Sequence, residues 1–211
     1  MIPLYDLLLF AIAAMVLAIT PGPNMVYLIS RTLSQGKKAG LISLMGVITG
    51  FLFHIVLVSF GLTAILFTIP YVYVALKWIG ALYLLYLAFQ AVKPNSKNLF
   101  EVDKMIKSDS PRKLFSIGFL TNVLNPKVAM FYLSLFPQFI KPMYGAVFTQ
   151  SIALGTTQLI VSLSINFLII AFAAKMATFF NRQPLWIKIQ KWFMGSVLLL
   201  LAVKMAFAKA K

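Results

Sequence analysis

The chain has 211 residues, of which 61% are hydrophobic and 11% are charged, whereas soluble domains are about half apolar and a quarter charged. This composition excludes an ordinary soluble domain, and the length allows one compact helical bundle. The net charge of +15 would suggest nucleic acid binding in a soluble protein, but here Lys and Arg lie in short connections between apolar runs. We therefore expect this charge to meet membrane lipid and no nucleic acid.

The apolar runs predict a single all-α domain, residues 1–211, with six transmembrane helices. A spanning helix needs about 20 mostly apolar residues. The six runs occupy residues 4–30, 41–69, 71–92, 114–140, 145–174 and 187–207. The N-terminal segment carries Asp6 and lacks a basic n-region, so we interpret it as a mature first helix and not as a signal peptide.

The first run is broken in its segment Thr20-Pro-Gly-Pro-Asn24. The two prolines lack the amides that would bond four residues back, so the carbonyls of Leu17 and Ile19 lose their helical donors. In hydrocarbon, such a break is tolerated only where it faces protein or a water-filled cavity. The residues after the break, Asn24 especially, begin a half-helix whose amide end attracts negative charge.

The second run contains Gly46 and Gly50, a pair of small residues that we expect to allow close helix packing. His54 follows in the same run, where it could relay protons near neutral pH or serve as a hydrogen-bonded interior histidine. A tight hairpin is predicted at residues 68–70, because the residue before Pro70 tends to leave the helix.

A polar linker, residues 93–113, follows the third run and contains Glu101, Asp103 and Asp109. These are all the acids of the chain except Asp6. We interpret the segment as a mobile, solvated connection between two halves of the protein.

The fourth run is broken at Pro126, which frees the carbonyl of Asn122. The next residue, Lys127, lies about 21 Å from either polar end of its run at 1.5 Å per helical residue, and hence near the bilayer midplane. A midplane Lys costs at least about 2.5 to 3.5 kcal/mol on insertion scales and should face the bundle interior. No carboxylate is near, so its partner is either freed carbonyls and Asn side chains or the carboxylate of a transported solute.

Polar residues in the fifth run, Gln158, Ser162, Ser164 and Asn166, either form hydrogen bonds between helices or line a cavity. Aromatic residues inside the runs, such as Tyr27 and Tyr132, are expected to belong to the core.

The sixth run resembles the third, because Lys77-Trp78 and Lys191-Trp192 are each followed by a leucine-rich stretch. The first and fourth runs are both broken by proline. Three spans precede the second copy, so the two copies would have opposite orientations, as in the inverted repeats of secondary transporters. The predicted fold is a 3+3 inverted repeat, with a first repeat at about 1–92 and a second at about 114–211.

Lys and Arg are concentrated in the first, third and fifth connections, which the positive-inside rule places in the cytoplasm, with the N-terminus outside. Lys204, Lys209 and Lys211 argue against an external C-terminus. The residues of these connections are Arg31, Lys37 and Lys38; Lys93, Lys97, Lys104, Lys107, Arg112 and Lys113; and Lys175, Arg182, Lys188 and Lys191.

Together these motifs resemble the lysine-exporter/homoserine–threonine resistance (LysE/RhtB) family of bacterial amino-acid exporters. The resemblance covers essentially the whole chain. It rests on Thr20-Pro-Gly-Pro-Asn24, Gly46-x-x-x-Gly50, Leu76-Lys-Trp-x-Gly80-Ala-x-Tyr-Leu84, Asn125-Pro-Lys-x-x-x-Phe131 and Phe136-Pro-Gln-Phe139.

The resemblance implies a multi-pass, homo-oligomeric exporter of the bacterial inner membrane, coupled to the proton gradient and not an enzyme. The stretch around His54 and the Asn-Pro-Lys segment are closer to the homoserine/threonine branch, which implies small neutral amino acids. Many members carry an acid in the fifth helix where this chain has Ser162. That departure leaves His54 as the only membrane-embedded group that titrates near neutrality.

We expect alternating access, with Lys127 and the half-helix amides facing a substrate carboxylate and the Asn side chains and freed carbonyls facing its ammonium. His54, Gln158 and Ser162 are candidates for proton coupling or cavity lining. We expect no catalytic residue, no cofactor and no metal site. The expected substrate-binding residues are Pro21, Gly22, Pro23, Asn24, Asn122, Asn125, Pro126 and Lys127.

Three alternatives stay open at this point. Export of a metal or other cation is disfavoured by the absence of cysteine and the single histidine. A non-transporting scaffold would lack a polar cavity between the broken helices. An intramembrane hydrolase would need a nucleophile and base at helical spacing, and the sequence offers none.

Overall fold

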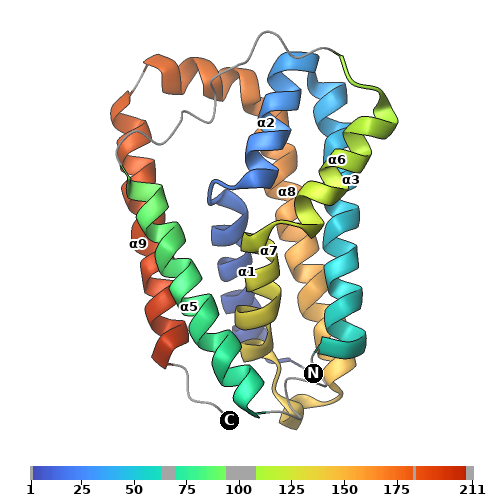
Figure 1. Ribbon diagram of the computed structural model, residues 1–211, viewed down its shortest axis with the longest axis vertical. Coiled ribbons are helices and arrows are strands. Elements are labelled where there is room, and N and C mark those ends of the chain that lie inside the picture. Colours follow the sequence, from blue (N-terminus) through green and yellow to red (C-terminus); the bar gives the residue numbers. More distant parts are fainter. Residues whose placement is uncertain (1, 63–69, 94–107, 183, 208–211) are drawn as a thin grey trace.

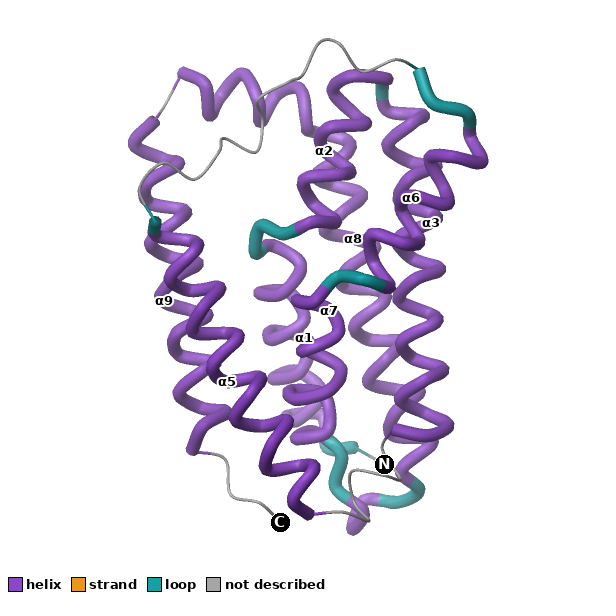
Figure 2. The backbone as a smooth tube through the Cα atoms, in the orientation of Figure 1, coloured by secondary structure: helices purple, strands orange, loops and turns teal. Residues whose placement is uncertain are grey.

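The computed structural model describes residues 2–62, 70–93, 108–182 and 184–207, which contain helices and no strand (Figures 1 and 2). The all-α prediction is therefore confirmed for this part of the chain. The α-helices are α1 (Leu4–Ile19), α2 (Pro23–Gln35), α3 (Lys37–Leu57), α5 (Pro70–Val92), α6 (Pro111–Val123), α7 (Pro126–Met130), α8 (Val147–Arg182) and α9 (Pro184–Phe207). Short π-helical and 3-10 segments are η1 (Val58–Leu62), η2 (Phe131–Leu135), η3 (Phe136–Phe139) and η4 (Pro142–Tyr144).

Both predicted breaks are present. α1 and α2 meet at an angle of 54°, and α6 meets the segment that begins with α7 at 42°. The residues just before Pro23 and Pro126 are extended, and each proline opens the helix that follows, where its missing amide has no cost. Each break thus divides one apolar run into two half-helices.

Length and hydropathy identify two helices in the described residues that can cross a membrane, Lys37–Phe60 and Val147–Lys175. Each bent pair can form one more span, which gives up to four. α5 and α9 occupy the third and sixth predicted runs, and their role as spans stays a prediction.

Several predicted boundaries change. α6 begins at Pro111, ahead of the apolar run, because the Ser110 side chain caps it by accepting a hydrogen bond from the Lys113 amide. α8 continues to Arg182, so Lys175 is helical and does not lie in a connection. The predicted hairpin at residues 68–70 and most of the linker, residues 94–107, lie outside the described residues.

The two ends of the molecule carry different connections (Figure 1). The junction of α2 and α3, the start of α6 and the end of α8 lie at the upper end of the view, whereas the starts of α1 and α5 and the segment η4 lie at the lower end. The α2–α3 junction, the start of α6 and the end of α8, which all carry Lys or Arg, therefore lie at the same end. Their assignment to the cytoplasm stays a prediction.

Packing follows a simple scheme, in which α3 lies along α6, α8 lies along α1 and α2, and α5 lies along α9. The α5–α9 pair stands beside the rest of the bundle (Figure 1). Glycine allows the closest approach, since a Cβ on Gly46 would lie 2.1 Å from the Phe115 carbonyl oxygen and one on Gly118 would lie 2.3 Å from that of Ser43. This confirms close helix packing at Gly46.

Candidate functional site

Lys127 joins the two broken spans. Its side chain is 6% exposed, and its Nζ donates hydrogen bonds to the carbonyl oxygens of Leu17 at 2.9 Å and Thr20 at 2.6 Å. The Leu17 carbonyl is one that the prolines were expected to free. The second acceptor is Thr20 in place of Ile19, because the extended backbone of Thr20 turns its carbonyl out of the α1 ladder.

Gly22 is needed at the break for space. Its backbone is extended, with φ −173°, a conformation open to any residue. A Cβ at this position would lie 3.0 Å from both Cε and Nζ of Lys127. The glycine therefore lets the ammonium approach the end of α1.

The second break is capped by Asn125, whose Oδ1 accepts a hydrogen bond from the Lys127 amide at 3.0 Å. The Asn125 amide donates to the Asn122 carbonyl at 3.0 Å. The expectation that this carbonyl would be free is therefore wrong, because the tight turn before Pro126 supplies the donor that the proline lacks.

Three asparagines around the breaks carry buried polar atoms that have no hydrogen-bond partner among the described residues. These atoms are Asn24 Oδ1, Asn122 Oδ1 and Nδ2, and Asn125 Nδ2. A buried polar group without a partner costs about 1 to 3 kcal/mol, so its presence needs an explanation. The set includes both acceptors and donors, which suits a zwitterionic ligand.

Gly50 fits one of these asparagines against α3. A Cβ on Gly50 would lie 2.6 Å from the Asn122 Cβ and 2.8 Å from its Oδ1. The glycine thus brings the second predicted span directly against the fourth, beside the break.

His54 lies next to the same region, and it is buried. Its Nε2 is 3.4 Å from the Asn122 carbonyl oxygen, and its ring stacks on Tyr132 with centroids 5.2 Å apart. Tyr132 Oη donates to Gln158 Oε1 at 2.7 Å, and Gln158 Nε2 donates to Ser162 Oγ at 2.9 Å. Gln158 therefore forms a hydrogen bond between the fifth and fourth predicted spans.

The structure brings most of the predicted residues together, with different roles. Pro23 and Pro126 are exposed and act by interrupting the helices. Thr20 was not predicted as a residue of the site, although its carbonyl accepts a hydrogen bond from Lys127 and its place before the first proline could have indicated it. Asp109, expected in a mobile linker, is fixed beside the start of α6, which the Ser110-Pro111 cap signal could have indicated.

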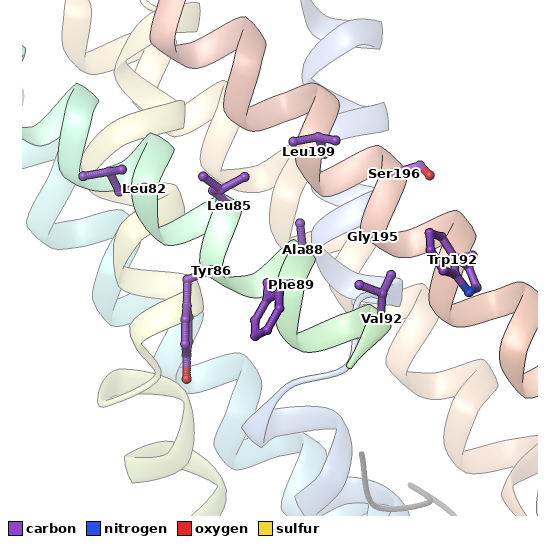
Figure 3. A pocket seen from close by; sticks show the side chains of 10 residues that line it. All are labelled: Leu82, Leu85, Tyr86, Ala88, Phe89, Val92, Trp192, Gly195, Ser196 and Leu199. Carbon is purple, nitrogen blue, oxygen red and sulfur yellow. The ribbon is translucent and has the colours of Figure 1, made fainter. Parts of the chain in front are cut away.

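The described residues offer little for two other kinds of site. Within the described residues, no group of three or more His, Asp or Glu side chains could hold a metal ion. A groove of about 580 Å³ lies between α5 and α9 (Figure 3). Its lining is almost entirely apolar, for example Leu85, Phe89 and Leu199, so it offers too few hydrogen bonds for a zwitterion.

Known proteins are similar to this chain over nearly its whole length. An uncharacterized membrane protein of Vibrio cholerae is 30% identical over 96% of this chain and 97% of its own length. A homoserine/homoserine lactone efflux protein of Salmonella typhimurium is 28% identical over 95% of each chain. No solved structure matches the chain. The family of LysE type translocators matches residues 15–209, and the chain belongs to this family.

Proposed function

We propose that the protein is a secondary transporter that exports small neutral amino acids, of the homoserine or threonine kind, from the cytoplasm. The observation that carries the proposal is the junction of two broken spans at one buried ammonium, together with buried asparagine atoms that have no hydrogen-bond partner among the described residues. Membership of a translocator family and a relative named as a homoserine efflux protein support it.

The junction offers both kinds of group that an amino acid requires. Carbonyl and amide oxygens, among them those of Thr20 and Asn24, can accept from a solute ammonium. Lys127 Nζ and Asn125 Nδ2 can donate to a solute carboxylate. We propose that the solute exchanges partners with Lys127, so that its ammonium takes the α1 carbonyls while its carboxylate takes the Lys127 ammonium. This exchange conserves hydrogen bonds and brings the missing anion to a buried cation.

The proposed architecture is six spans in a 3+3 inverted repeat. The packing supports it. In the repeat scheme, α1 corresponds to α6, α3 to α8 and α5 to α9. Exchanging these helices converts the α3–α6 contact into the α8–α1 contact and leaves the α5–α9 contact unchanged. In secondary transporters, the solute site lies at such a repeat interface, in discontinuous helices near the midplane.

We propose that proton coupling acts through His54. An imidazole changes charge in the physiological range, and the ring of His54 faces the carbonyl of Asn122, whose side chain lies at the proposed site. Protonation would favour the bond to this carbonyl and change the position of Asn122. Localisation in the bacterial inner membrane and a homo-oligomeric state are the corresponding expectations for the assembled protein.

The test is efflux from cells loaded with a mixture of amino acids, compared at matched membrane abundance. Lys127→Ala is expected to abolish export, and Asn24→Ala to raise KM about tenfold, the effect of about 1.4 kcal/mol. Asn24→Ala is the sharper variant because Asn24 Oδ1 has no hydrogen-bond partner in the part of the chain that the structure describes. His54→Gln should retain export but lose its pH dependence.

Lys38→Ala, at the exposed start of α3, is the matched control for loss of a positive charge. Wild-type export by Lys127→Ala would remove Lys127 from the site. Cells with the wild-type protein that lose no amino acid faster than empty cells would overturn the function itself. Export that requires an added metal ion would favour the cation exporter.

A further inference from the structure

A polar cluster ties the end of α2 to the start of α6, and we call it the α2 lock. Asp109 Oδ2 accepts from Arg31 Nη1 at 2.7 Å and from Gln35 Nε2 at 3.1 Å. Asp109 Oδ1 pairs with Lys113 Nζ at 2.6 Å. The Asp109 amide donates to Gln35 Oε1 at 2.9 Å, so both the side chain and the backbone of this aspartate are held.

A second cluster at the opposite end ties the start of α1 to Lys141, the residue just before η4, and we call it the α1 lock. Lys141 Nζ pairs with Asp6 Oδ2 at 2.7 Å. Gln150 Oε1 accepts from the Lys141 amide at 3.1 Å, and Gln150 Nε2 donates to the Lys141 carbonyl at 2.9 Å. The backbone of one lock residue is again held by a glutamine.

The two locks are equivalent in the repeat scheme. Each joins an aspartate at the start of one broken span to a cation at the end of the other, at opposite ends of the bundle (Figure 1). Each cation also lies over a tyrosine ring, Arg31 over Tyr27 at 5.4 Å and Lys141 over Tyr144 at 5.5 Å. The chain has only four acids, and one is placed in each lock.

The locks have the properties of contacts that open. The paired side chains are partly exposed, 18% and 8% in the Arg31–Asp109 pair and 26% and 14% in the Lys141–Asp6 pair. Ion pairs in contact with water contribute little net stability, because water replaces each partner at small cost. Between the locks lies the junction at Lys127.

We propose that the α1 lock and the α2 lock are the two gates of the transport cycle and that they open alternately. The inference rests on the proposed function, since gates serve a solute site between them. Both locks are closed in this structure, which seals the junction at both ends. Opening the α1 lock separates the start of the first span from the end of the fourth span. The closed α2 lock meanwhile keeps the other end of the bundle sealed.

Single cysteines can report this alternation because the chain has none of its own. Ser43 lies beneath the α2 lock, with its Oγ donating to Tyr27 Oη at 3.2 Å. Ser151 follows Gln150 of the α1 lock and is fully buried, and its Oγ has no partner among the described residues. Ser43→Cys and Ser151→Cys are near-isosteric reporters, one for each gate.

The experiment measures the alkylation rate of each reporter by a membrane-impermeant maleimide, applied to intact cells and to inside-out vesicles. Asp6→Asn should raise the rate at the Ser151 reporter about two- to fivefold and lower it at the Ser43 reporter, as expected for loss of one partly exposed ion pair. Asp109→Asn should do the reverse. Lys38→Gln is the matched control and should change neither rate.

The reciprocal response is the decisive result. A rise at both reporters, a rise at one without a fall at the other, or no change overturns the gates. Exchanging the charges by Asp6→Lys with Lys141→Asp should restore the wild-type rates, and failure to do so overturns the pairing. Size-exclusion profiles confirm that each variant is folded.

The alkylation rates do not depend on a measurement of export, so the gates and the proposed function can fail separately. Reciprocal rates in a protein that exports no amino acid would retain the gates and reject the proposed function. Normal export, with alkylation rates that change in neither aspartate variant, would reject the gates alone.

Discussion

The two halves of the first broken span, α1 and α2, pack against the fourth predicted span through different chemistry. On the side of α1, the buried ring of Phe10 packs against Phe131, Phe136 and Phe139, with centroids 5.1 to 5.6 Å apart. On the side of α2, the contact with α6 includes a polar bond, which Tyr27 Oη donates to the Leu114 carbonyl at 2.8 Å. Aromatic packing is lost outright when helices separate, whereas water replaces polar contacts. We therefore expect the α2 side to separate more easily.

The largest effect is expected for Phe10→Ala, which tests whether aromatic packing holds the α1 side. Removing a fully buried phenylalanine leaves a cavity and should cost about 3 to 5 kcal/mol of unfolding free energy. Thermal unfolding in detergent measures it, with Leu8→Ala, on the exposed face of α1, as the control. A loss no greater than that of the control would show that the aromatic cluster does not hold the α1 side.

An intermediate effect is expected at the close contact between α3 and α6. A Cβ on Gly46 meets backbone atoms of Phe115 and Phe119, which cannot rotate away. For Gly46→Ala, overpacking should lower the free energy of unfolding by up to about 3 kcal/mol. The higher helix propensity of alanine offsets roughly 1 kcal/mol of this, which leaves a net loss of about 2 kcal/mol. Gly155→Ala is the comparison, because its Cβ would meet only the Ile55 side chain, and an equal loss would contradict the argument.

The smallest effect is the pH dependence of the locks, to which Asp109 and Lys141 contribute with opposite signs. Hydrogen bonds from Lys113 and Gln35 hold the pKa of Asp109 below its usual 3.8, so its stabilisation is present above that value and lost as pH falls through the lowered pKa. The hydrogen bond to Asp6 raises the pKa of Lys141 above 10.5, so the contribution of Lys141 is present below that value and lost as pH rises through the raised pKa.

The measurement is the unfolding temperature of wild type, Asp109→Asn and Asp6→Asn across pH. The differences from wild type should be constant between about pH 5 and 9, where neither group titrates. The Asp109 difference should vanish in acid and the Asp6 difference in strong alkali. A change near neutral pH would mean that the locks themselves sense protons.

Sequence reasoning reached the parts of the structure that local rules determine. The breaks at Pro23 and Pro126 follow from proline chemistry, and close packing at Gly46 follows from residue size. The start of α6 at Pro111 lies outside the predicted run because hydropathy does not include the cap that Ser110 provides.

The rest of the site depends on contacts between distant segments. The pairing of Lys127 with Thr20, and of Asp109 with Arg31, requires knowing which helix ends meet, and no local pattern gives that. For the same reason, the sequence left open whether carbonyls or a solute would accompany Lys127. In this structure the carbonyls do.

The bond between Lys127 and the end of α1 also has a consequence for biogenesis. Its partners Leu17 and Thr20 precede it by 110 and 107 residues. When the ribosome delivers the first span to the insertion machinery, the amine that satisfies those carbonyls has not been synthesised. Water or the translocon must shield the unfinished span until the second half of the chain arrives, so completion of the first helix is one of the last events in assembly.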